Sequence, residues 1–239
     1  MNQQRGIIFD LDDTLCDWQA AQRGGEQAIN HLLQQRQLDQ QLFWQHFHAV
    51  NETLHSQFSA GHISKMQYRQ QRFGIPLQQQ QIIDEALNQQ LNEVFIAAAL
   101  DAIQFIQGAQ ASLQQALQLG YKVGILTNGA SESQRNKLHK LGIQQQVHVV
   151  CISEETGIGK PHAAAFNNIC QQLGCTTGNC LMVGDSWHND IAPARSLGLA
   201  AYWAQRDNDG IQQQDATFSG SMQALQQQLQ AQHHWWHSG

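Results

Sequence analysis

Two carboxylates separated by a single leucine follow a short apolar run near the start of the chain. The run Ile7-Ile8-Phe9 is typical of a buried strand, and it stops at Asp10, Asp12 and Asp13. In an extended backbone alternate side chains leave from one face, so Asp10 and Asp12 would point the same way. Two carboxylates held together repel each other unless a cation or a proton lies between them. The pattern indicates a Mg²⁺ site with a nucleophile and a general acid/base; the alternative is a strand that ends in a solvated acidic turn.

The other candidate residues share one feature, which is a position just after a predicted strand or in a loop between elements. They are Thr127 and Asn128, Lys160, and Asp185 and Asp190. The carboxyl ends of the strands in a doubly wound sheet lie along one edge, where such folds bind ligands. The set then offers a hydroxyl, an amide, a fixed cation and further carboxylates. Displacement at phosphorus needs this combination, because it requires positioning and neutralisation of charge. Singly, each residue has a structural alternative, such as a solvated loop lysine or an acid near a helix N-terminus.

The elements that must position these residues alternate between strand and helix after residue 108. Strands are predicted at 122–126, 147–152, 180–183 and 199–203, and helices at 111–119, 131–141 with Ser131 as a cap, 161–173 opened by Pro161, and after Asp185 up to 197. Such alternation implies parallel strands joined by right-handed crossovers. We therefore predict an α/β fold with a doubly wound, Rossmann-like parallel sheet.

The region between the first strand and residue 100 has a helical pattern throughout. Helices are predicted at 21–37, 41–59, 64–73 and 79–99, with Ser64 as an N-cap and with Gly74 and Pro76 ending the third helix. This region is interpreted as an inserted all-helical domain of bundle type. The predicted division is a catalytic core of residues 1–15 and 101–239 and a helical cap of residues 16–100.

Composition excludes several classes of protein. A chain of 239 residues is long enough for one large domain with an insertion. The net charge of −6 argues against nucleic-acid binding, which needs a basic surface. The sequence shows no membrane-spanning segment and no signal peptide, so a cytoplasmic protein is expected. The five cysteines do not suggest a disulfide framework. Glutamine runs at 78–81, 144–146, 212–214 and 226–228 are interpreted as solvated helix faces and loops, and no function is inferred for the His/Trp-rich segment 233–237.

Four motifs in order along the chain resemble those of the haloacid dehalogenase-like phosphohydrolase superfamily. They are Asp10-Leu11-Asp12-Asp13-Thr14, Thr127-Asn128, Lys160-Pro161, and Gly184-Asp185 followed by Asp190. The resemblance covers nearly the whole chain, and the helical insertion after the first motif resembles the C1-capped subfamily. Each motif is weak alone, but their order and their agreement with one architecture make the resemblance specific.

The resemblance implies roles for the acidic residues. Asp10 would attack phosphorus and become an aspartyl phosphate, and Asp12 would protonate the leaving oxygen and then activate water. Mg²⁺ would be held by the Asp10 carboxylate, the Asp12 backbone carbonyl and Asp185, with waters completing the shell. Dehalogenases of this fold lack an acid at the position of Asp12, so the resemblance favours a phosphatase. A phosphomutase is an alternative, because it uses the same pair of aspartates.

The resemblance also implies roles for the remaining motif residues. Thr127 and Asn128 would hold phosphoryl oxygens. Lys160 would neutralise the nucleophile and the phosphate, and Asp190 would orient Lys160 or a metal-bound water.

The expected substrate is a small phosphorylated metabolite. Segments 49–54, 61–64 and 72–73 of the helical region, and segments 126–129 and 152–155 of the core, look like those of bacterial pyrimidine 5′-nucleotidases. Aromatic side chains could stack on a base or could instead pack the bundle: Trp18, Phe43, Trp44, Phe47, Phe58 and Phe73. We therefore expect a nucleoside 5′-monophosphate phosphatase. The alternative is a phosphatase of a small acid or sugar such as phosphoglycolate, which the cations Arg23, Arg36, Lys65, Arg69 and Arg72 keep open. No nucleic-acid or membrane partner is expected, and the chain would be a monomer or a homodimer.

Overall fold

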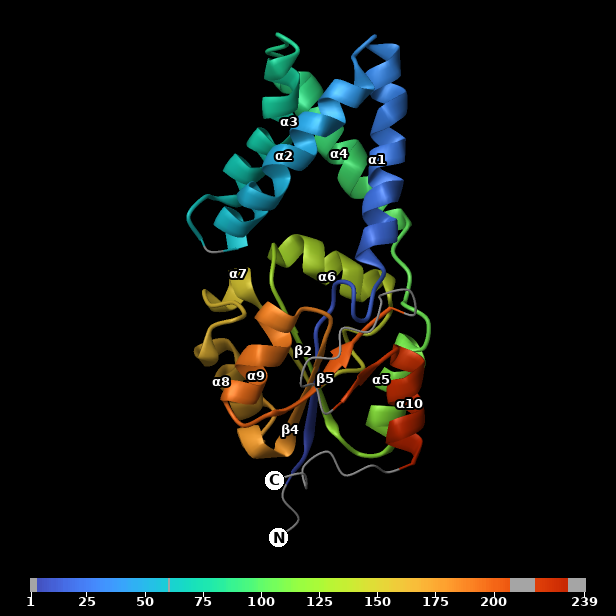
Figure 1. Cartoon of the computed structure of the whole chain (residues 1–239), viewed down its shortest axis with the longest axis vertical. Helices are drawn as coiled ribbons and strands as arrows, with labels where there is room; N and C mark the ends of the chain where they lie inside the picture. The colour runs from blue at the N-terminus through green and yellow to red at the C-terminus, as the bar shows by residue number, and fades with distance from the viewer. Residues whose placement is uncertain (1–3, 60, 207–217, 232–239) are drawn as a thin grey trace. The chain divides into compact units, whose positions relative to one another are not determined.

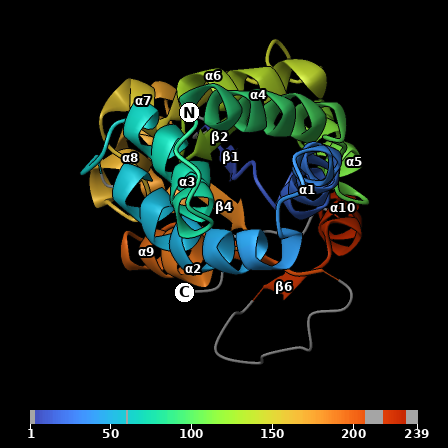
Figure 2. The same ribbon diagram turned by 90° about the horizontal axis from the view of Figure 1, so that it is seen from above.

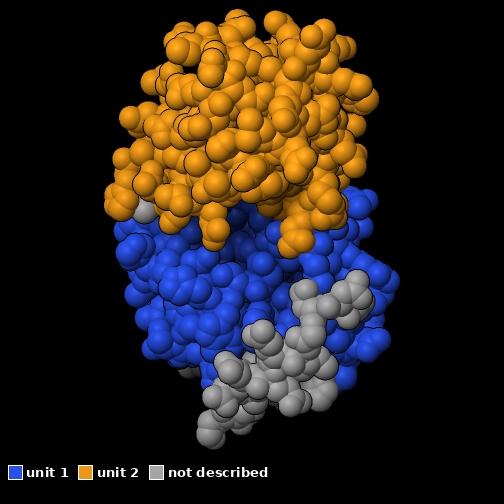
Figure 3. Space-filling view, turned by 45° about the horizontal axis from the view of Figure 1, so that its top comes forward, with its two compact units in different colours: residues 1–17, 104–239 blue, residues 18–103 orange. Residues whose placement is uncertain are grey.

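The chain divides into two compact units. The computed structural model describes residues 4–59, 61–206 and 218–231. Unit 1 combines Met1–Asp17 with Gln104–Gly239, and unit 2 is Trp18–Ile103, so unit 2 is inserted into unit 1 (Figure 3). The glutamine run 212–214 and the segment 233–237 lie outside the described residues. No helix in the described part of the chain is both long and apolar enough to cross a membrane.

Unit 1 is built on a parallel sheet (Figure 1). Within the described residues the sheet has six strands in the order β3-β2-β1-β4-β5-β6, and every pairing between neighbours is parallel. The strands are β1 Gly6–Phe9, β2 Lys122–Thr127, β3 Val149–Ile152, β4 Cys180–Gly184, β5 Ala200–Ala204 and β6 Ser219–Gly220. This strand order is that of a doubly wound, Rossmann-like sheet, with its reversal at β1. The predicted fold class is therefore confirmed, although the short β6 was not predicted.

The central strands are apolar on both faces because helices cover both sides of the sheet. Ile7 and Ile8 of β1 and Leu181 and Met182 of β4 are fully buried, although neighbouring side chains on a strand point to opposite faces. A strand covered on both faces gains from apolar side chains at every position. This explains why β1 and β4 appear in the sequence as continuous apolar runs that end abruptly at aspartates.

Helices of unit 1 lie on both sides of the sheet. They are α5 Ala109–Gln118, α6 Ser131–Lys140, α7 Ser153–Thr156, α8 Ala163–Gln172, α9 Ala192–Ser196 and α10 Met222–Gln230. Phe166 and Ile169 of α8 belong to the same core cluster as Ile8 of β1. On the other side, α5 and α10 lie next to each other (Figures 1 and 2), and the Ser112 hydroxyl donates to the Met222 carbonyl at 2.6 Å. The helices on the two faces of the sheet hold β1, β2 and β4 in place, and these strands in turn position the loops at their carboxyl ends.

Unit 2 consists of four helices in the part of it that is described. They are α1 Trp18–Gln35, α2 Gln40–Ser59, α3 Lys65–Gln79 and α4 Glu85–Asp101. Ser64 caps α3 as predicted: its side chain accepts from the Gln67 amide, and the Gln67 side chain accepts from the Ser64 amide. The predicted end of this helix at residue 73 is wrong. Pro76 lies inside the helix and is buried with Phe73 and Leu77, so packing outweighs the loss of one helical hydrogen bond.

Three other predicted helix starts also need correction. Ser131 is the first residue of α6 rather than its cap. Helix α8 begins at Ala163, and Pro161 instead belongs to the preceding loop, where its peptide bond with Lys160 is cis. Helix α4 begins after Asp84, whose carboxylate caps it by accepting from the Leu87 amide at 2.9 Å. In each case the cap or loop geometry shifts the start by a few residues.

Phenylalanine side chains from α2, α3 and α4 form the core of unit 2. Phe43, Phe47 and Phe73 are at most 1% exposed, and Phe95 is 3% exposed. The Phe73 ring stacks on Phe47 with centroids 5.3 Å apart and meets Phe95 edge-on at 5.6 Å. These phenylalanines therefore pack the bundle, which leaves the partly exposed Trp18, Trp44 and Phe58 among the aromatic side chains considered for base stacking.

Candidate active site

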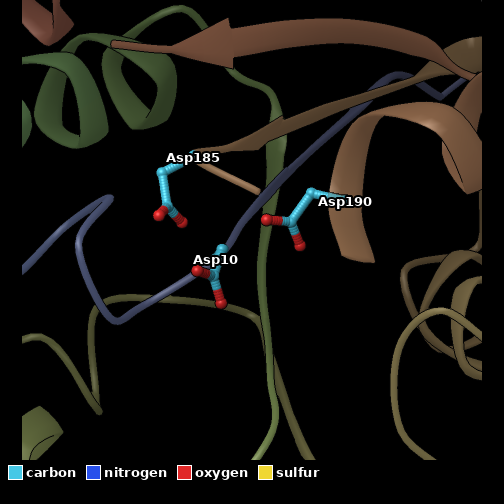
Figure 4. Close-up of side chains that lie close together, drawn as sticks. All are labelled: Asp10, Asp185 and Asp190. Carbon is cyan, nitrogen blue, oxygen red and sulfur yellow. The ribbon is translucent and has the colours of Figure 1, made fainter. Parts of the chain in front are cut away.

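Three carboxylates converge where the central strands end. Asp10 directly follows β1, Asp185 directly follows β4, and Asp190 lies one turn further along the chain. Figure 4 shows the three side chains facing a common space, and one oxygen from each lies within 4.8 Å of the others. The Asp10 amide donates to the Val183 carbonyl at 2.9 Å, so the pairing of β1 with β4 extends to Asp10. The edge of the sheet thus brings Asp10 together with two acids that lie 175 and 180 residues further along the chain.

Lys160 lies between two of these carboxylates. Its Nζ is 2.5 Å from Asp10 Oδ1 and 2.7 Å from Asp190 Oδ1, and its side chain is 4% exposed. Burial alone would lower the pKa of Lys160, but Asp10 and Asp190 outweigh burial and raise the pKa above its ordinary value. The ammonium therefore stays charged and fixes the two carboxylates in place.

The cluster still carries more negative than positive charge. Burial raises the pKa of Asp10 well above its ordinary value, and Lys160 offsets this only in part. Burial, followed by the charges of Asp190 and Asp13, raises the pKa of Asp185 to about 6. Ionised carboxylates that lie close together repel each other, and a cation bound between them removes this repulsion. Their oxygens are the hard donors that Mg²⁺ prefers, so the residues present fit that ion.

Asn128 does not face the acidic cluster. Its side-chain amide donates to the Lys160 carbonyl at 2.8 Å, and its Oδ1 accepts from the Lys160 amide at 2.9 Å. A Cβ at Gly159 would lie 2.6 Å from that Oδ1, so only glycine permits this approach. The structure thus places the Asn128 side chain as a clamp on the loop that carries Lys160, whereas the sequence interpretation assigned it to phosphoryl oxygens.

Asp190 is held by a π-type turn, Trp187–Ile191, that precedes α9. The sequence predicted one continuous helix here, and this is wrong because the wider turn interrupts it. Asp190 is fully buried, its Oδ2 accepts from the Ser186 amide at 3.1 Å, and Gly184 packs against it. The turn thereby fixes the Asp190 carboxylate beside Lys160.

Asp12 makes contacts that the sequence analysis did not anticipate. Lys137 Nζ of α6 lies 2.7 Å and 2.8 Å from the two Asp12 carboxylate oxygens. Gln134 Nε2 lies 3.0 Å from Asp12 Oδ2 and 2.6 Å from the Thr127 hydroxyl. Both α6 side chains are buried. The sequence did hold a signal: Gln134 and Lys137 share a helical face with the buried Leu138 and Leu141, so they could not both face solvent.

The electrostatic environment of Asp12 differs from that of Asp10. Burial acts to raise the pKa of the Asp12 carboxyl, but the Lys137 ammonium and hydrogen bonds from Lys137, Gln134 and Cys16 together hold it below its ordinary value. The turn after Leu11, in which Asp13 adopts a φ of 59°, carries Asp12 toward α6. Asp10 and Asp12 therefore pair with different lysines, and two carboxylates close in sequence have different charge environments.

The chain is similar to known proteins over most of its length. Residues 4–198 match the family model of haloacid dehalogenase-like hydrolases. The pyrimidine 5′-nucleotidase YjjG of Escherichia coli strain K12 is 32% identical over 201 residues, which are 82% of this chain and 84% of that protein. The HAD-hydrolase YfnB of Bacillus subtilis, crystallised with magnesium, superposes with a TM-score of 0.75 at 24% identity over 96% of this chain and 100% of that chain. A 2-haloacid dehalogenase from Pseudomonas syringae superposes with a TM-score of 0.66 at 23% identity over 96% and 99%.

The fold and the matched residues define the class of this protein. It belongs to the haloacid dehalogenase-like hydrolase family, and the predicted resemblance is thereby confirmed. The structural likenesses at 24% and 23% identity support the fold alone, because the neighbours include both a magnesium-bound hydrolase and a dehalogenase.

Proposed function

We propose that this hydrolase is a Mg²⁺-dependent phosphomonoesterase that acts through an aspartyl phosphate on Asp10. The observation that carries the proposal is the contact of the buried Lys160 ammonium with Asp10 at the strand end, beside Asp185 and Asp190. A fixed cation next to a nucleophilic carboxylate stabilises the charge that develops on phosphoryl oxygens. Asp12 favours phosphoester over carbon–halogen cleavage, because a departing alkoxide needs a proton and a halide does not.

The residues that would hold Mg²⁺ are the Asp10 carboxylate, Asp185 and the backbone carbonyl of Asp12. When bound, the ion would supply charge neutralisation at the phosphoryl oxygens. Thr14, which is fully buried, donates to Asp185 Oδ1 at 3.3 Å and orients that carboxylate. Such support from outside the ligand set is common around metal-binding carboxylates.

In the proposed mechanism an Asp10 oxygen forms a bond to phosphorus as the bond to the leaving oxygen breaks. Asp12 in its protonated form gives its proton to that leaving oxygen; because the pKa of Asp12 lies below its ordinary value, only a small fraction of the free enzyme carries this proton at neutral pH. Water then attacks the aspartyl phosphate and loses a proton to the Asp12 carboxylate, which releases inorganic phosphate and restores Asp10. Lys160 holds Asp10 in place, and Asn128 holds Lys160 through its backbone. With the Asn128 side chain turned to the Lys160 loop, the Thr127 hydroxyl and the Lys160 ammonium are the candidates for contacts with the phosphoryl group.

The proposed substrate is a nucleoside 5′-monophosphate. Its support is the similarity to a pyrimidine 5′-nucleotidase across 82% of this chain, a span that must include both units. The substrate's leaving group would be recognised by unit 2, because the strand-end residues are occupied with phosphoryl chemistry. The buried phenylalanines of unit 2 cannot stack on a base, so Trp18, Trp44 and Phe58 are the better candidates for that contact.

A substrate screen tests this assignment. With Mg²⁺ present, uridine and cytidine 5′-monophosphates should show kcat/KM values at least about tenfold above those of phosphoglycolate and sugar phosphates, which is about 1.4 kcal/mol of transition-state preference. If phosphoglycolate or a sugar phosphate is the best substrate by a wide margin, the nucleotidase assignment is wrong while the phosphatase chemistry stands. Hydrolysis of none of these esters would remove the chemistry as well.

A further inference from the structure

Two side chains of α6 lie on the carboxylate of Asp12, although neither belongs to the four motifs. Lys137 approaches both carboxylate oxygens at nearly equal distances, 2.7 Å and 2.8 Å. Gln134 approaches one of them at 3.0 Å. Positions 134 and 137 are three residues apart on a helix, so both side chains leave from the same face. The carboxylate plane is therefore defined by two donors from one rigid element.

The burial of these donors distinguishes this arrangement from a surface ion pair. The Lys137 side chain is 5% exposed, while that of Asp12 is 28% exposed. Exposed ion pairs contribute little, but a buried ammonium is costly unless it has a charged partner. Asp12 supplies that charge for Lys137. The contact also holds the Asp12 carboxylate in place, because a lysine side chain buried in α6 has little freedom to follow it.

Gln134 also links Asp12 to the phosphate side of the site. The same Nε2 that contacts Asp12 lies 2.6 Å from the Thr127 hydroxyl and 3.2 Å from the Asn128 carbonyl. Thr127 ends β2 and is 1% exposed. One amide nitrogen therefore connects the side chain that would transfer the proton to the strand end that would face the phosphoryl group.

We infer that Lys137 and Gln134 are positioning residues that set the location of the Asp12 carboxylate relative to the leaving oxygen. This inference rests on the proposed function, in which Asp12 transfers the protons. Neither α6 side chain exchanges a proton with the substrate. Without them the Cys16 thiol, 3.3 Å from Asp12 Oδ1, is a weaker donor that leaves the carboxylate less firmly oriented. Proton transfer to the leaving oxygen then loses its alignment, whereas attack by Asp10 does not depend on these residues.

The test uses leaving groups that differ in their need for a proton. Lys137→Met should lower kcat/KM for an alkyl ester, uridine 5′-monophosphate or whichever ester the screen ranks first, by about 10- to 100-fold, within the range that general acid catalysis supplies. The same variant should change kcat/KM for p-nitrophenyl phosphate by less than about threefold, because nitrophenolate leaves without a proton. The ratio kcat/KM is compared because it reports the steps up to departure of the leaving group and leaves out the later hydrolysis of the aspartyl phosphate, which is common to both esters. Lys137→Arg keeps a donor to both oxygens and should recover most of the alkyl activity.

The exposed Lys140 of the same helix provides the matched control, and Lys140→Met should leave both activities unchanged. In an Asp12→Asn background, Lys137→Met should add less than about a twofold loss, because the two residues act as a unit. An equal loss for both esters, or a full further loss in the Asp12→Asn background, would overturn the inference. If Lys137→Met does not fold, Gln134→Leu takes its place and should show the same selective loss for the alkyl ester. A Gln134→Leu enzyme without this selective loss would overturn the inference.

The parent proposal fails separately. An active Asp10→Asn enzyme would remove the phosphatase mechanism and this inference together. An inactive Asp10→Asn enzyme combined with an unselective Lys137→Met would remove only the positioning role.

Discussion

Replacing Gly184 with alanine would displace Asp190 from its place beside Lys160. Gly184 is the last residue of β4, and a Cβ at this position would lie 2.4 Å from Asp190 Oδ2. Ordinary van der Waals contact begins at 3.4 Å, so the carboxylate would have to move by about 1 Å. Asp190 is fully buried, with Oδ2 accepting from Ser186 and Oδ1 contacting Lys160 at 2.7 Å. The movement must therefore disturb the lysine that contacts Asp10.

The size of the effect follows from that displacement. A misplacement of about 1 Å in a catalytic arrangement can cost on the order of 10²-fold in rate, which corresponds to about 2.7 kcal/mol. Overpacking of a filled site also costs about 1–3 kcal/mol of folding stability. We thus expect Gly184→Ala to lose about two orders of magnitude in kcat while remaining folded.

The assay is p-nitrophenyl phosphate hydrolysis with Mg²⁺ present, combined with a urea unfolding curve. Gly178→Ala is the matched control, because a Cβ at Gly178 would meet nothing within 4 Å. This control should keep wild-type kcat. If Gly184→Ala is as active as Gly178→Ala, the claim that Asp190 is fixed and needed for Lys160 would be refuted.

Two further outcomes are expected. EDTA should abolish turnover and added Mg²⁺ should restore it. Asp185→Ala should raise the Mg²⁺ concentration needed for half-maximal activity, because it removes one of the hard oxygen donors. Full activity of a metal-stripped sample would contradict the metal requirement. Phe73→Ala should lower the free energy of unfolding by about 3–5 kcal/mol in urea titrations, since it removes a fully buried ring from the core of unit 2. Phe58→Ala, at a half-buried position, should lower it by less. Equal losses would show that Phe73 does not anchor that core.

The sheet and the acids at its edge were predictable because both depend on local sequence. Continuous apolar runs identify strands that are covered on both faces, as in β1 and β4. Parallel strands bring their carboxyl ends to one edge, so the polar residues that follow them had to lie close together. Asp10 and Asp185 satisfy this rule directly, because each follows the last residue of a central strand.

The contacts of α6 and of Asn128 were not predictable in the same way. The helical face that Gln134 and Lys137 share with buried leucines indicates their burial, but their partner Asp12 reaches them only through the turn after Leu11. Asn128 contacts the backbone of Lys160, which is 32 residues away, and no local pattern specifies that pairing. The π-type turn before α9 also depends on tertiary contacts, since Asp190 is held by Lys160 and by the Ser186 amide. Each of these features depends on which elements become neighbours after folding.

Hydrolysis by Asp10→Asn tests the central claim most directly. Asparagine keeps the shape of the side chain but removes the attacking charge and one carboxylate oxygen, so kcat for p-nitrophenyl phosphate should fall by at least about 10³-fold. Asp101→Asn, at an exposed position at the end of α4, should retain wild-type activity. A folded Asp10→Asn protein with activity near that of Asp101→Asn would show that no aspartyl phosphate forms on Asp10.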